Sequence, residues 1–209
     1  MSPRTCAIVG VVMALTSTHA SPADPPAGPA DRTAAGCFSV GGGYLRARMR
    51  GAIDLDLNWK NAEMQCDGGP RPPGKDHDSN GVRVSIGGPA RGAGHRIRLV
   101  FGIAGVTEGT SGNGLRTNVT VLFEGERRIF ATQGDDKCTV DSLTQERVET
   151  LGAGRAVYRV TARGFCLGPA SSLVKDERVI LTSFDFAGRV EFSDDDRHAR
   201  DPASHATKT

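Results

Sequence analysis

Apolar and polar side chains alternate with a period of two along most of the chain, and this pattern constrains the fold more than any other feature. The clearest run covers residues 45–59, where the apolar residues are Leu45, Ala47, Met49, Ile53, Leu55, Leu57 and Trp59. Side chains of a β-strand point alternately to opposite faces, so the run predicts strands with one buried face and one solvated face. Gly51, in the middle of the run, predicts a turn or bulge between two strands.

The same period recurs in short segments that are separated by glycine-rich turns. The further expected strands cover residues 62–66, 82–86, 97–103, 119–123, 127–132, 156–166, 179–186 and 190–192. Only Ser142–Leu151 could form a helix, because its apolar residues stand at a loose helical spacing. The pattern therefore predicts an all-β fold, an antiparallel β-sandwich of the jelly-roll or immunoglobulin-like kind, with at most one short helix.

The N-terminal residues predict export. Arg4 supplies a short basic start, residues 6–15 form an apolar run, and small residues lead to a cleavage site after Ala20. The run is shorter than the ~20 apolar residues that a membrane-spanning helix needs. We therefore expect residues 1–20 to be a signal peptide, and we expect no transmembrane segment once it is removed.

Composition divides the rest of the chain into three parts. The segment after the signal peptide is rich in Pro and Ala, and the C-terminal segment has no large apolar residue. Neither can bury enough apolar surface to fold alone. The expected organisation is a linker at 21–35, a β-sandwich domain at 36–192 and a disordered tail at 193–209.

Removal of the signal peptide takes Cys6 away and leaves four cysteines: Cys37, Cys66, Cys138 and Cys166. An even number of cysteines in an exported chain predicts two disulfides. Four cysteines allow three connectivities. Pairing of sequence neighbours is favoured, because each bridge then closes a loop of about thirty residues and stabilises the fold by roughly 3–4 kcal/mol. A zinc site is disfavoured, because no pair has the close spacing of a structural zinc module.

Charge and residue usage limit the location and the partners. The formal net charge is only +2, whereas a protein that binds nucleic acid normally has a clearly basic domain or face. Nucleic acid is therefore not an expected partner. Arg far outnumbers Lys, and Ala and Gly are abundant, which is typical of a GC-rich bacterial genome. Export from a bacterial cell predicts a periplasmic or secreted protein, in an environment where disulfides persist.

One loop carries a metal-ligand pattern. Asp76, Asp78 and Asn80 alternate ahead of Gly81, as the first oxygen ligands of a calcium loop do. Gly87 occupies the twelfth position, where a bidentate Glu would close such a site. The alternative interpretation is a polar hairpin loop, in which these residues supply turn conformations. No other cofactor is expected.

A second candidate site consists of arginines on strand faces: Arg46, Arg48 and Arg50 on one strand, and Arg96 and Arg98 on another. Stacked together they would form a basic face that grips phosphate or carboxylate through the guanidinium fork. Phospholipid head groups and acidic polysaccharide are the candidate ligands. The alternative is an ordinary solvated face, because Asp54 and Asp56 share the parity of the first set and can form cross-strand pairs with it.

The sequence contains no recognisable catalytic motif. There is no G-x-S-x-G elbow, and no cysteine remains free as a nucleophile once the two disulfides form. We therefore expect a non-catalytic exported module that binds an envelope component or a protein partner. The alternative is a metal-dependent hydrolase with the loop of Asp76, Asp78 and Asn80 at its site.

Overall fold

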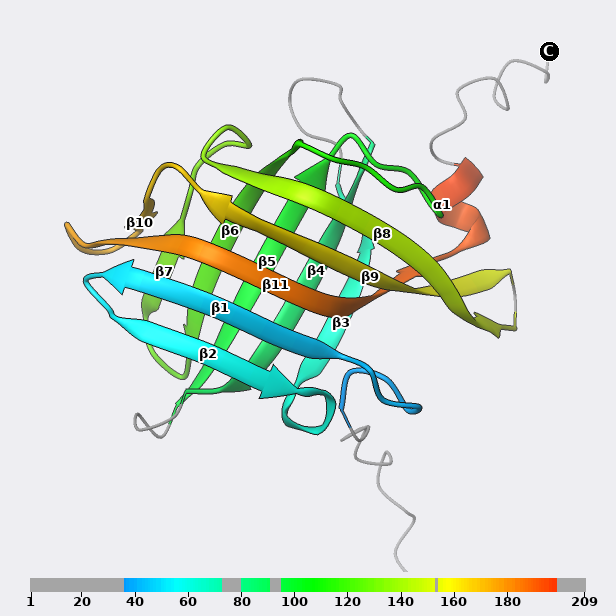
Figure 1. Cartoon of the computed structure of the whole chain (residues 1–209), viewed down its shortest axis with the longest axis horizontal. Coiled ribbons are helices and arrows are strands. Elements are labelled where there is room, and N and C mark those ends of the chain that lie inside the picture. Colours follow the sequence, from blue (N-terminus) through cyan, green and yellow to red (C-terminus); the bar gives the residue numbers. More distant parts are fainter. Residues whose placement is uncertain (1–35, 73–79, 91–94, 153, 199–209) are drawn as a thin grey trace, which may run out of the picture. The chain divides into compact units, whose positions relative to one another are not determined.

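The computed structural model describes residues 36–72, 80–90, 95–152 and 154–198, which form two packed layers of antiparallel β-sheet. The front sheet in Figure 1 has the strand order β2-β1-β11-β9-β8. Its strands are β1 (Tyr44–Gly51), β2 (Leu55–Lys60), β8 (Cys138–Leu151), β9 (Arg155–Cys166) and β11 (Arg178–Phe192). The prediction of an all-β antiparallel sandwich is thus confirmed.

The back sheet is a meander of five strands that pair in the order of the chain. These strands are β3 (Gln65–Pro70), β4 (Gly81–Pro89), β5 (Arg96–Ala104), β6 (Leu115–Glu124) and β7 (Arg128–Ala131). They cross behind the strands of the front sheet at a steep angle (Figure 1). The connections within this sheet are sequential hairpins and not the Greek-key connections of the two sandwich types that the sequence suggested.

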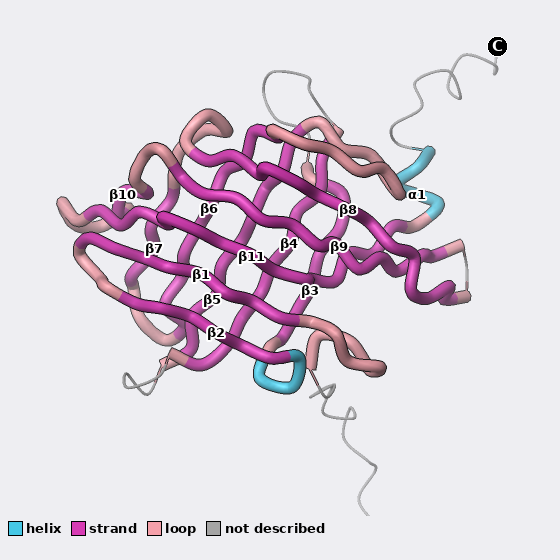
Figure 2. The backbone as a smooth tube through the Cα atoms, viewed as in Figure 1, coloured by secondary structure: helices cyan, strands magenta, loops and turns pink. Residues whose placement is uncertain are grey.

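The two layers are also hydrogen-bonded to each other along one side. The short strand β10 (Ala170–Ser172) pairs with β7 of the back sheet and with β11 of the front sheet. The first residues of β8, Cys138–Val140, pair with β6. Helix in the described part of the chain is limited to the 3-10 turn η1 (Asn61–Glu63) and to α1 (Asp194–His198), as Figure 2 shows.

Aromatic rings fill the space between the sheets. Phe101 of β5 lies with its ring centroid 5.0 Å from that of Phe184 and 4.6 Å from that of Phe186, both on β11. Trp59 is buried at the end of β2, where its indole N–H donates to the carbonyl of Pro89 at 2.9 Å. The alternation in the sequence corresponds to this arrangement, because the apolar residues of β1 and β2 face the core and their polar neighbours face solvent.

The structure corrects three expected elements. Residues 61–63, where the strand expected over residues 62–66 should start, form η1, and β3 begins only at Gln65. Ser142–Leu151, the one candidate helix, is a strand and belongs to β8. A register shift between Arg147 and Glu149 breaks the period of two there, and the bulge explains the helix-like spacing of the apolar residues. Residues 190–192, expected as a separate strand, continue β11 through Gly188. A Cβ at Gly188 would lie 2.5 Å from Cγ1 of Val84, so this glycine permits close contact between the sheets and does not end the strand.

Both bridges favoured by the sequence are present. Cys37 is bonded to Cys66 of β3, and Cys138 of β8 is bonded to Cys166 of β9, its partner in the strand register. Among the described residues, no helix has the length and hydropathy needed to cross a bilayer. These two findings are compatible with an exported module. The expected signal peptide and linker, and residues 199–209 of the expected tail, lie outside the described residues.

Candidate functional site

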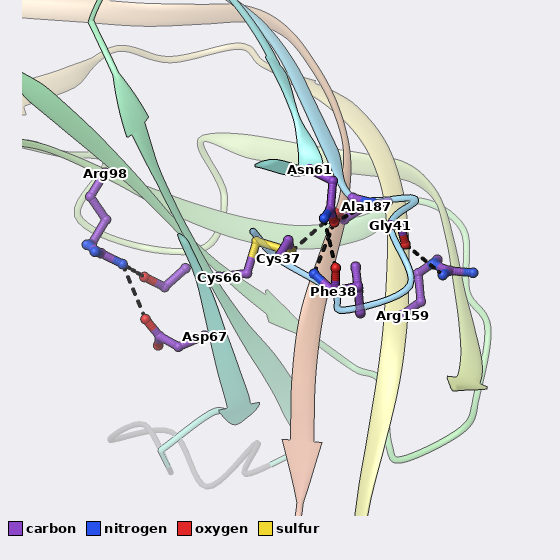
Figure 3. Close-up of a disulfide and its surroundings, with 11 residues drawn as sticks. Cys37, Phe38, Gly41, Asn61, Cys66, Asp67, Arg98, Arg159 and Ala187 are labelled. Atoms are coloured by element: carbon purple, nitrogen blue, oxygen red, sulfur yellow. Dashed lines mark hydrogen bonds and ion pairs between the residues drawn. A yellow bond between two sulfur atoms is a disulfide. The ribbon is translucent and has the colours of Figure 1, made fainter. Parts of the chain in front are cut away.

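The segment that precedes β1, residues 36–43, is fastened to the sandwich by Asn61 (Figure 3). The Oδ1 atom of Asn61 accepts hydrogen bonds from the backbone N–H groups of Phe38 at 3.0 Å and Gly43 at 3.1 Å. Its Nδ2 donates to the carbonyl of Phe38 at 2.8 Å. The carbonyl of Asn61 accepts from the N–H of Cys37 at 3.1 Å. One side chain thus satisfies several backbone groups that no strand pairs. We call residues 36–43 the anchored segment.

The backbone at Gly36 has φ +86°, and a side chain there would collide with the carbonyl of Asn61, so the start of the anchored segment requires glycine. Arg159 of β9 holds the middle of the segment. Its Nη2 donates to the carbonyl of Gly41 at 3.3 Å, and its guanidinium lies 5.0 Å from the centroid of the Phe38 ring. Together with the Cys37–Cys66 bridge, these contacts fix the segment at both ends and in its middle.

A groove with a volume of about 750 Å³ lies beside the anchored segment. Residues 36–40 and Cys66 supply part of its lining. The other lining residues come from β8, β9 and β11: Val148, Glu149, Leu151, Val157 and Arg189. Most of these side chains are apolar. Val40 leaves 83% of its surface exposed, so apolar surface remains available to a ligand.

The charged groups of the groove are few. Nη2 of Arg189 forms an ion pair with Glu191 at 3.2 Å and stays one-third exposed. Glu149 is exposed on β8. An apolar cleft with a small number of charged groups is the usual composition of a small-molecule site, in which the polar groups orient the ligand.

The calcium-like loop lies mostly outside the described residues, which include Asn80 but neither Asp76 nor Asp78. The carbonyl of Asn80 accepts a hydrogen bond from the N–H of Gly105 at 3.0 Å. Among the described residues, no three His, Cys, Asp or Glu side chains converge as metal ligands. The proposal of a metal site at this loop therefore stays a prediction.

The two arginine sets do not form one face, because β1 belongs to the front sheet and β5 to the back sheet. On β5, Arg98 donates to Glu124 at 2.8 Å and to Ser85 at 3.0 Å, and Arg96 forms an ion pair with Glu124 at 3.3 Å. Carboxylates of neighbouring strands thus engage this set. On β1, Arg46, Arg48 and Arg50 lie on the outer face of the front sheet.

Tyr44 extends the outer face of β1 with a group that the sequence analysis did not single out. Its hydroxyl donates to Oδ1 of Asp185 at 2.8 Å, across the β1–β11 pairing. Partial burial, and next the hydrogen bond to the Asp185 carboxylate, raise the pKa of Tyr44 to about 12. The guanidinium of Arg46 lies 5.1 Å from the centroid of the Tyr44 ring. The alternation of β1 places Tyr44 on this face, but the sequence does not show that Asp185, which lies opposite Arg46 on β11, is within reach of the Tyr44 hydroxyl.

The sequence does not predict the groove either, because its residues come from four separate stretches of sequence and one of them is at the β8 bulge.

No protein-family model, no curated protein and no solved structure matches this chain.

We predict that Asn61→Ala lowers the free energy of unfolding by about 2–3 kcal/mol, because it removes three hydrogen bonds to backbone groups of the anchored segment. Urea denaturation followed by tryptophan fluorescence measures the change. Asn58→Ala, an equivalent truncation on the exposed side of β2, is the control and should change stability by less than about 0.5 kcal/mol. Equal effects of the two substitutions would contradict the anchoring role.

The Tyr44 hydroxyl gives a pH prediction. Folding favours its neutral form, so this contribution to stability is complete below the ordinary pKa of about 10 and is lost as the pH rises through about 12. Tyrosine ionisation can be followed by absorbance at alkaline pH. The ionisation step of Tyr44 is the one that is absent from the Tyr44→Phe variant, and it should lie well above pH 10. Asp185→Asn should move that step toward lower pH, because the hydrogen bond to a carboxylate is lost. Ionisation of Tyr44 near pH 10 in the folded protein would overturn this assignment.

Proposed function

We propose that this protein is an exported, non-catalytic module that binds an apolar or amphiphilic small molecule of the cell envelope in the groove beside the Cys37–Cys66 disulfide. The proposal includes the signal peptide at residues 1–20 and a periplasmic or secreted location. Two disulfides support such a location, since they persist in oxidising compartments.

The observation that carries the proposal is the size and lining of the groove. Its volume of about 750 Å³ falls within the roughly 300–1,000 Å³ of typical small-molecule sites. Phe38, Val148 and Leu151 give it apolar surface for an aliphatic or ring system. Arg189 gives it a cation for an acidic head group. A fatty-acid-like amphiphile combines these two properties.

The rigidity of the lining favours binding as well. The anchored segment is held by a disulfide, by the hydrogen bonds of Asn61 and by Arg159, so a ligand need not order it. A site formed before the ligand arrives avoids the entropy cost of arranging its own side chains. These contacts therefore serve affinity in addition to stability.

A fluorescent fatty acid, dansyl-undecanoic acid, tests the proposal. We expect saturable binding by the oxidised protein, with an increase in dansyl emission as the probe enters an apolar site. Leu151→Glu places a carboxylate in the groove and should weaken binding at least tenfold, because that charge must be desolvated when the probe binds and it repels the carboxylate of the probe.

The matched control is Leu167→Glu, the same change at a leucine that is 78% exposed and does not line the groove. It should leave the affinity unchanged. Absence of saturable binding, or an equal loss in both variants, would refute the groove as the site. Circular dichroism of each variant confirms that the fold is retained.

A further inference from the structure

The outer face of the front sheet presents a row of polar side chains across four strands. The register places Arg46 of β1 between Asn58 of β2 and Asp185 of β11, and Asp185 in turn lies opposite Arg163 of β9. In Figure 1 this face is turned toward the viewer, and no other described strand lies over it. Neighbouring strands are about 4.8 Å apart, so Arg46 and Arg163 lie within about 10 Å of each other across the sheet.

The carboxylates of this face are already engaged by other donors. Oδ1 of Asp56 accepts a hydrogen bond from Nη1 of Arg50 at 2.7 Å. This hydrogen bond is the main reason why the pKa of Asp56 is lowered. Oδ1 of Asp185 accepts from the Tyr44 hydroxyl at 2.8 Å. Asp185 is thus hydrogen-bonded to Tyr44 as well as paired with Arg46, and Asp56 is hydrogen-bonded to Arg50 as well as paired with Arg48.

Arg46 and Arg48 are consequently held only loosely. Arg46 lies 3.6 Å from Asp185 and Arg48 lies 3.7 Å from Asp56, distances too long for hydrogen bonds. Their side chains remain 66% and 61% exposed. Arg163 is exposed too, and it has no ion pair or hydrogen bond with the described residues. Most of the guanidinium N–H groups on this face are thus available to an external acceptor.

Arg46 and Arg48 border a shallow depression of about 280 Å³ over β1, β2 and β11, and Arg163 lies beyond its edge on β9. Its polar lining consists of Arg46, Arg48, Asp56, Asn58, Ser183 and Asp185. Guanidinium forks bind a carboxylate or phosphate with two parallel hydrogen bonds. The amide of Asn58, the hydroxyl of Ser183 and the carboxylate of Asp185 are suited to hydroxyl groups. The depression therefore offers partners for acidic groups and for hydroxyl groups side by side.

We propose that this depression is a second binding site, separate from the groove, and that it binds a carboxylated polysaccharide through Arg46 and Arg48, while Arg163 on the neighbouring strand β9 contacts a further sugar acid of the same chain. A sugar acid carries both a carboxylate and neighbouring hydroxyls, which matches the composition of the lining. The site shares no lining residue with the groove.

A lipid surface matches this site less well. Proteins that bind at a membrane surface insert apolar side chains beside their basic residues. The large apolar side chains that are exposed among the described residues are Val40, Leu167, Leu173 and Val174, and none lines the depression. The site therefore lacks the apolar contacts that would retain it at a bilayer.

Isothermal titration calorimetry with oligogalacturonate tests the proposal at low and at physiological salt. We expect binding of oligogalacturonate and none of a neutral galactose oligosaccharide of the same length. Arg46→Gln together with Arg48→Gln should weaken binding by tenfold or more, since each substitution removes a charge-assisted hydrogen bond.

The matched control removes the same charge from the back sheet, by Arg83→Gln together with Arg96→Gln, and should leave the affinity within about twofold. A dansyl-undecanoic acid titration of the Arg46/Arg48 variant should be unchanged, which shows that the groove is intact. Three outcomes overturn the proposal: no binding of oligogalacturonate, an equal loss in both double variants, or stronger binding to phosphatidylglycerol vesicles or inorganic phosphate than to oligogalacturonate.

Discussion

Burial of one face of each sheet against the other is the constraint on which the rest of the structure depends. Phe101 of the back sheet packs against Phe184 and Phe186 of the front sheet, and every second residue of β1 and β2 faces this shared core. A strand that buries one face must leave the other face in solvent or cover it with another element. The two proposed binding surfaces lie outside the core for this reason, because the inward residues pack against the opposite sheet.

The outer surface is used in two ways. At one place the chain adds an irregular segment, residues 36–43, and ties it down with Asn61, Arg159 and a disulfide, so that an apolar groove is formed. At the other, the sheet face remains open and carries arginines whose nearest carboxylates are engaged elsewhere. The first arrangement suits an apolar ligand and the second an anionic one.

Local pattern in the sequence was enough to predict most of the strands and both disulfides, but not β10 and β8. Period-two alternation survives in β1 and β2 because each of their residues is either in the core or in solvent. It failed in β8, where the bulge near Val148 shifts the register and imitates a helix. It also failed at Gly188, where a glycine that looks like a strand end allows the sheets to approach. In both places a contact with another strand decides the local structure.

The sites could be predicted much less well than the strands. Alternation placed Arg46 and Arg48 on one face, but whether they are free depends on Tyr44 and Arg50 competing for Asp185 and Asp56. The sequence does not show this competition, because it depends on distances between side chains in the folded protein. The groove joins residues near position 38 to residues near 66, 150 and 189, and no local pattern relates these stretches. Long-range register, which single-sequence patterns do not contain, is the missing information.

The Cys37–Cys66 bridge and Asn61 hold the anchored segment against the sandwich. Amide hydrogen exchange of Phe38, Gly43 and Phe101, compared between the natural chain and the Cys37→Ser/Cys66→Ser variant, tests it most directly. The account predicts that Phe38 and Gly43 are protected in the natural chain and lose protection in the variant, while Phe101 stays protected. Unchanged protection of Phe38 and Gly43 in the variant, or loss of protection at Phe101 along with them, would contradict it.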